Sequence, residues 1–173
     1  MVILGIIPAR YASTRFPGKP LADIAGKPMV QRVFEQASKA LEHVVVATDD
    51  QRIYDAVQAF GGKVVMTSDR HPSGTDRCAE AVLKFEQDYH QTVDVVINIQ
   101  GDEPFINAEQ LEALVAAIER EDVDIATLAT PIDSSEALHN PNVVKVVMTP
   151  DGRALYFSRS PIPYLRGYNA DEW

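Results

Sequence analysis

The chain has 173 residues, of which 46% are hydrophobic and 24% are charged, the composition of an ordinary globular domain. We expect one domain spanning residues 1–173. The net charge of −9, with no basic stripe beyond the first 19 residues, argues against nucleic-acid or anionic-membrane partners. No apolar run approaches the ~20 residues that cross a bilayer, and none resembles a secretory leader, so we expect a cytoplasmic protein. The single cysteine, Cys78, excludes an intramolecular disulfide framework and any Cys-x-x-Cys motif.

Apolar runs that end in turn residues alternate with segments of helical periodicity. The runs predict strands at residues 2–7, 43–48, 63–67, 94–99 and 124–129. Several are continuous Val/Ile runs, which are typical of parallel strands buried on both faces. The alternation predicts an α/β fold built on a mostly parallel sheet.

Four helices are predicted between these strands. They begin at Pro28, at about Asp50, at about Thr75 and after an N-cap at Asn107. The expected inward faces are Met29, Val33, Ala37 and Leu41; Ile53, Val57 and Phe60; Ala79, Val82, Leu83 and Phe85; and Leu111, Leu114, Val115 and Ile118. Cys78 is expected to be a half-buried helix residue rather than a catalytic thiol.

A change of pattern follows residue 140. Residues 143–148 and 154–157 flank Asp151-Gly152, which is a strong signal for a β-hairpin. We expect this antiparallel element, near residues 143–158, to join the parallel sheet.

The loop after the first predicted strand carries three cations, Arg10, Arg15 and Lys19, before the first acidic residue, Asp23. It contains neither a dinucleotide-binding nor a P-loop glycine pattern. Two arginines can grip phosphate oxygens bidentately and the lysine adds a point charge, so the loop suits a polyphosphate. A solvated basic loop that forms surface ion pairs explains the charges equally well.

Two carboxylates, Asp102 and Glu103, follow the predicted strand at 94–99, where a carboxylate is out of place unless it is paired or metal-bound. Mg²⁺ is commonly held by one or two carboxylates together with substrate phosphates. The alternative is an ordinary acidic turn before Pro104. Together with the cationic loop, the pair indicates phosphoryl transfer.

Other candidate residues leave alternatives open. Residues 73–77 open the third predicted helix, where backbone amides can bind an anion, although an ordinary capped helix explains them equally well. Arg159 could hold a substrate carboxylate or lie on the surface. The four histidines lack zinc-ligand spacing, which favours surface or packing roles.

Six stretches, taken together and in order, resemble the 3-deoxy-manno-octulosonate (Kdo) cytidylyltransferases, also called CMP-Kdo synthetases. They are residues 7–21, 46–49, 73–77, 98–104, 140–146 and 154–159. The related sialate cytidylyltransferases are similar in the first loop but lack the Gln-Gly-Asp-Glu-Pro and Tyr-Phe-Ser-Arg stretches.

The resemblance implies a three-layer, Rossmann-like nucleotidyltransferase fold. It implies that CTP and Kdo react to give pyrophosphate and CMP-Kdo for lipopolysaccharide biosynthesis, with Mg²⁺ and a homodimer. The anomeric hydroxyl of Kdo would attack the α-phosphorus in line, with no protein nucleophile.

The resemblance also implies residue roles. Arg10, Ser13, Arg15 and Lys19 would hold the CTP phosphates, and Ser73, Gly74, Arg77 and Gln100 would surround the cytidine. Asp102 would bind Mg²⁺, Arg159 would face the sugar, and Arg10, Lys19 and Asp102 would be the catalytic residues.

Family members continue beyond position 173, into a sugar-site stretch, much of the dimer surface and a second metal-binding aspartate. We therefore expect this chain to be C-terminally incomplete relative to the family, to bind CTP weakly and to turn over poorly. Two alternatives remain: a non-catalytic nucleotide-binding module, and a cytidylyltransferase for another acid sugar, such as amino-Kdo or sialic acid.

Overall fold

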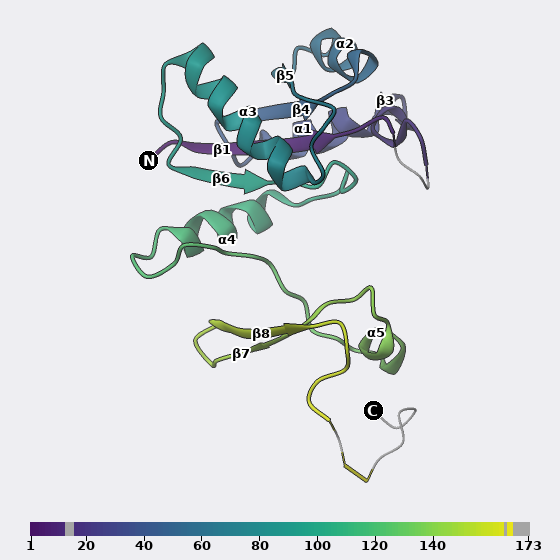
Figure 1. Cartoon of the computed structure of the whole chain (residues 1–173), viewed down its shortest axis with the longest axis vertical. Helices are drawn as coiled ribbons and strands as arrows, with labels where there is room; N and C mark the ends of the chain where they lie inside the picture. The colour runs from purple at the N-terminus through teal and green to yellow at the C-terminus, as the bar shows by residue number, and fades with distance from the viewer. Residues whose placement is uncertain (13–15, 165, 168–173) are drawn as a thin grey trace. The chain divides into compact units, whose positions relative to one another are not determined.

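The computed structural model describes residues 1–12, 16–164, 166 and 167. They belong to two compact units, Met1–Ala126 and Thr127–Trp173. Figure 1 shows the course of the chain through both. Among the described residues, no helix is long and apolar enough to cross a membrane.

A four-stranded parallel sheet forms the centre of the first unit (Figure 1). Its order is β5 (Val64–Met66), β4 (His43–Thr48), β1 (Ile3–Ala9) and β6 (Val95–Asn98). Every neighbouring pair is parallel, with Ile6 opposite both Val45 and Asn98. The structure therefore confirms four of the five predicted strands and the parallel sheet.

Helices cover both faces of this sheet (Figure 1). The helices α1 (Met29–Ala37), α2 (Gln51–Ala59) and α4 (Ala108–Ile118) pack on one face, and α3 (Gly74–Tyr89) packs on the other. Successive side chains of a strand point to opposite faces, so Leu4 and Ile6 contact the α3 side while Ile7 packs with α1. These three layers are the expected architecture.

Capping side chains define where three of these four helices begin. Asp50 and Ser73 accept hydrogen bonds from backbone amides of the first turns of α2 and α3. At α4, Asn107 and Gln110 form the reciprocal capping box that the sequence predicts. The first helix begins one residue later than expected, because Pro28 is its N-cap.

The inward face of α3 agrees with the prediction at Val82 and Phe85 and differs from it at Ala79 and Leu83. Cys78, Ala81 and Phe85 are buried, whereas Ala79 is exposed and Leu83 is 60% exposed. The helix is rotated so that Arg77, which is fully buried, can reach Asp49 and Thr67 at the ends of β4 and β5. Apolar residues lie on both sides of this helix, so their spacing alone does not fix the buried face.

The expected strand at residues 124–129 is absent from the described structure. Ile125 is 87% exposed and Leu128 is also exposed. No neighbouring strand is assigned to this stretch among the described residues, so neither ladder hydrogen bonds nor burial stabilises an extended conformation there. An apolar run was therefore insufficient evidence for a strand.

Short elements that the sequence did not predict follow the first loop. The 3-10 helix η1 (Lys19–Leu21) leads into a small hairpin of β2 (Asp23–Ile24) and β3 (Lys27–Pro28). Its turn is closed by the Asp23 carboxylate, which accepts a hydrogen bond from the Gly26 amide. These elements place Lys19 in an ordered turn.

The second unit contains the helix α5 (Ser135–His139) and the predicted hairpin, formed by β7 (Lys145–Met148) and β8 (Ala154–Ser158). The hairpin is confirmed as a two-stranded antiparallel sheet within this unit. Its expected junction with the parallel sheet stays a prediction. The buried Lys145 ammonium donates to the carbonyls of Asn140, Val143 and Arg159, so it ties the start of β7 to the residues just before it and just after β8.

Candidate nucleotide site

Three segments of the first unit meet at Pro8, near the carboxyl end of β1. A Cβ atom added to Gly101, in the loop after β6, would lie 3.0 Å from the Pro8 carbonyl oxygen. One added to Gly74, the first residue of α3, would lie 3.5 Å from Pro8 Cγ. Ligands of open α/β sheets bind beyond the carboxyl ends of the strands, which is where these segments converge.

Lys19 and Asp102 form an ion pair at this edge, with 2.6 Å between Lys19 Nζ and Asp102 Oδ2. Their side chains are 37% and 51% exposed, so a ligand in solvent can reach both. The cation predicted to bind phosphate and the carboxylate predicted to bind Mg²⁺ therefore lie side by side.

Tyr11 closes the base of the cationic loop, which ends at Lys19. The Tyr11 carbonyl accepts a hydrogen bond of 2.9 Å from the Gly18 amide. The Arg52 guanidinium carbon lies 3.3 Å from the centre of the Tyr11 ring, and Arg52 also pairs with Asp50 at 2.6 Å. Hydrogen bonds from Arg52 hold the pKa of the Asp50 carboxyl below its ordinary value. Sequence reasoning missed this support, which depends on the packing of α2 against the loop.

The remaining residues predicted to hold the phosphates occupy the same loop. Arg10 directly follows β1 and is exposed, as a phosphate ligand must be. Ser13 and Arg15 lie outside the described residues. Their roles stay predictions.

Arg77 is 1% exposed and has protein partners at both ends of its guanidinium group. Nη2 lies 2.6 Å from Asp49 Oδ2, and Nη1 donates to the Thr67 hydroxyl. Arg77 thus joins α3 to the ends of β4 and β5 from inside the molecule. Its predicted contact with cytidine stays a prediction.

Ser73 and Gln100 directly precede Gly74 and Gly101, the two glycines that approach Pro8. The Ser73 hydroxyl caps α3 by accepting from the Asp76 amide, so the capped-helix interpretation of this segment is confirmed. Gln100 is exposed, with its amide nitrogen 3.5 Å from Asn98 Oδ1. Both side chains retain capacity for further hydrogen bonds, and their nucleotide roles stay predictions.

Arg159 belongs to the second unit, directly after β8. Its Nη1 donates to the Pro141 carbonyl at 2.8 Å. Its predicted contact with the sugar also stays a prediction.

Comparison with known proteins identifies the family. Residues 4–171 match the cytidylyltransferase family model. A 3-deoxy-manno-octulosonate cytidylyltransferase of Parabacteroides distasonis is 56% identical, over 100% of this chain and 69% of that protein. The chain belongs to the 3-deoxy-manno-octulosonate cytidylyltransferase family.

Further members of the 3-deoxy-manno-octulosonate cytidylyltransferase family are similar to this chain over most of its length. The enzyme of Thermodesulfovibrio yellowstonii is 54% identical over 96% of this chain and 67% of its own length. A solved CMP-Kdo synthetase in complex with CTP is 45% identical, with a TM-score of 0.83 over 96% of this chain and 68% of that one. The chain thus spans about two thirds of the length of these proteins. A cytidylyltransferase of Leptospira borgpetersenii, at 24% identity and a TM-score of 0.56 over 68% of this chain and 48% of its own, shares the fold alone.

Proposed function

We propose that this chain transfers CMP from CTP to Kdo, giving pyrophosphate and the CMP-Kdo used in lipopolysaccharide biosynthesis. The observation that carries the proposal is the likeness to the CTP-bound CMP-Kdo synthetase, which extends over nearly the whole chain. The site at the end of β1 suits the same chemistry, because it combines exposed cations with a carboxylate.

The reaction needs positioning and charge neutralisation more than a protein nucleophile. The anomeric hydroxyl oxygen of Kdo forms a bond to the α-phosphorus, and the bond from that phosphorus to the α,β-bridging oxygen breaks. Pyrophosphate leaves with the electron pair, and the hydroxyl proton passes to solvent. Arg10, which follows β1, and Lys19, which lies beside Asp102, would neutralise the charge that develops on the leaving group.

We propose Mg²⁺ as the cofactor, with Asp102 as its ligand from this chain. The half-exposed carboxylate supplies the hard oxygen donor that Mg²⁺ prefers. Within the described part of the chain no three His, Cys, Asp or Glu residues gather as a metal cluster. We propose that substrate phosphates and water supply the other ligands of the ion, which would polarise the phosphoryl oxygens when bound. Lys19 would then exchange its contact with Asp102 for a phosphate oxygen.

The test is pyrophosphate release by the purified chain with CTP, Kdo and Mg²⁺. Replacing Kdo by amino-Kdo or sialic acid identifies the sugar, and omitting Mg²⁺ tests the cofactor. Release with sialic acid but not with Kdo would contradict the proposed substrate. CTP binding without turnover would indicate a nucleotide-binding module, and a low rate would agree with the expectation that this chain turns over poorly.

Two further properties belong to the same proposal. A homodimer would appear in light scattering at twice the 19.1 kDa mass of the chain. A cytoplasmic location follows from the proposed use of CTP, and fractionation of cells that express the chain would test it.

A further inference from the structure

We propose that Glu80, on α3, is a positioning residue for the nucleotide site, because it fixes the connection from β5 to α3 that carries Ser73 and Gly74. This inference rests on the proposed function. Glu80 is not among the residues that the sequence singles out.

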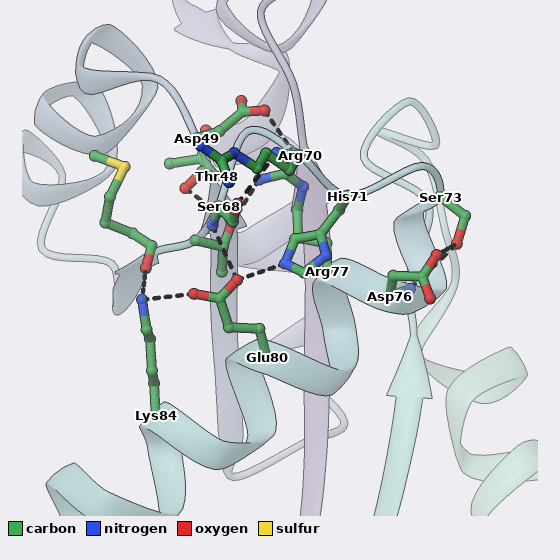
Figure 2. Close-up of polar contacts among 12 residues, drawn as sticks. Thr48, Asp49, Ser68, Arg70, His71, Ser73, Asp76, Arg77, Glu80 and Lys84 are labelled. Carbon is green, nitrogen blue, oxygen red and sulfur yellow. Dashed lines mark hydrogen bonds and ion pairs between the residues drawn. The ribbon is translucent and has the colours of Figure 1, made fainter.

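The Glu80 carboxylate gathers three donors (Figure 2). Oε2 accepts from the Ser68 amide at 2.9 Å and lies 2.5 Å from His71 Nε2. Oε1 lies 2.8 Å from Lys84 Nζ, and Lys84 also donates to the Met66 carbonyl. One carboxylate therefore ties α3 to the connecting segment at several points.

Few buried side chains anchor the segment that connects β5 to α3, residues 67–73. Asp69, Arg70, Pro72 and Ser73 are exposed, and Ser68 and His71 are only partly buried. Segments with few buried apolar contacts open easily, so polar contacts must supply their order. Hydrogen bonds from Lys84, Ser68 and His71 lower the pKa of Glu80 to about 2, so its carboxylate stays ionised and keeps accepting from all three at neutral pH.

The contacts of Glu80 are connected to the nucleotide site through the segment that leads to Ser73 and Gly74. Arg77 fixes Thr67, before the segment, and Glu80 fixes Ser68 and His71 within it. The chain then reaches Ser73 and Gly74, and Gly74 lies against Pro8 at the carboxyl end of β1. Figure 2 shows Glu80 at the centre of these contacts and Ser73 at the start of the helix. Releasing the segment would shift Ser73 and Gly74 without removing either.

The experiment measures the Kd of CTP by calorimetry on the full chain with Glu80→Gln, Glu80→Ala and a control, Glu86→Gln. The amide side chain in the Glu80→Gln variant can still accept from the Ser68 amide but forms no ion pairs, so this variant retains part of the effect. Glu86 lies on the same helix and accepts from the Val93 amide at 2.9 Å, away from the nucleotide site. Its substitution weakens a comparable contact.

We expect Glu80→Gln to raise the Kd of CTP roughly tenfold and Glu80→Ala to raise it further, whereas Glu86→Gln leaves it unchanged. The kcat at saturating CTP should stay within about twofold, since the catalytic groups remain. Equal affinity of wild type and both Glu80 variants would overturn this proposal alone, as would equal weakening in Glu86→Gln. A wild-type chain that binds no CTP would overturn the proposed function, and this inference with it.

Discussion

Lys19 and Asp102 are 83 residues apart in the chain, yet their charged atoms lie 2.6 Å from each other. The sheet accounts for this, because β1 and β6 are parallel neighbours whose carboxyl ends open on the same edge. An ion pair this exposed contributes little to stability, typically about 0–1 kcal/mol. The two residues are therefore better explained by what they can bind than by what they hold together.

Replacing Asp102 by Ala should separate function from stability. We expect pyrophosphate release to fall at least ~100-fold, because the carboxylate proposed to hold Mg²⁺ is lost. The free energy of unfolding should change by less than about 1 kcal/mol, because the pair with Lys19 is exposed. Steady-state kinetics and urea unfolding measure the two quantities. Glu112→Gln, an exposed carboxylate on α4, is the control that should retain activity, and an Asp102→Ala chain as active as wild type would contradict the assignment.

Arg77→Met should destabilise the fold. The substitution leaves Asp49 without its cation in a largely buried position, and breaking such a pair from one side costs about 3 kcal/mol or more. Urea unfolding should show this loss. Lys27→Met, which removes a cation from its pair with Glu35, where both side chains are well exposed, is the control and should cost less than about 1 kcal/mol. Equal losses in the two variants would show that the burial of Arg77 is unimportant.

The parts of the fold that could be predicted are those with a local signal. The strand His43–Thr48 contains the continuous apolar run 44–47 and is buried, and Asn107 with Gln110 forms the expected capping box. The phase of α3 could not be predicted, because Leu83 competes with Cys78 and Ala81 for the buried face. The strand predicted at residues 124–129 was wrong for a similar reason, since an apolar run does not reveal whether a neighbouring strand exists.

The site shows the same division. Parallel topology was sufficient to place Lys19 near Asp102, because both follow strands that end at one edge. The Arg77–Asp49 pair and the contacts of Glu80 depend on how α3 is rotated against β4 and β5. No spacing within the chain encodes that rotation, so a structure was needed to find them.

Gly101→Ala should weaken both stability and activity. The added methyl group would meet the Pro8 carbonyl oxygen at 3.0 Å, and a backbone atom cannot move away as a flexible side chain can. We expect a loss of roughly 1–2 kcal/mol in unfolding and lower turnover, because the next residue is Asp102. In Gly74→Ala the added methyl contacts Pro8 at an ordinary 3.5 Å, so its stability should stay near that of wild type. A Gly101→Ala chain of unchanged stability would show that this loop has room to move.

The Cys78 thiol should be inert in the folded chain. It is buried between α3 and the sheet, and burial raises its pKa to about 11. Thiolate is the reactive form, so at about pH 8 an aromatic disulfide reagent should label the native chain far more slowly than the urea-unfolded chain. Rapid labelling of the native chain would show that α3 opens readily.

Low pH should remove the stability that Glu80 contributes. Its folded-state pKa, about 2, lies below its ordinary value of 4.5, so the contribution is complete above about pH 5 and is lost as the pH falls from there toward 2. Wild type should therefore exceed Glu80→Gln in unfolding free energy by roughly 1 kcal/mol at pH 7, and the difference should shrink between about pH 5 and pH 3. Urea unfolding of both proteins at each pH measures it. A difference that does not change over this range would mean that the ionised carboxylate is not what anchors the segment.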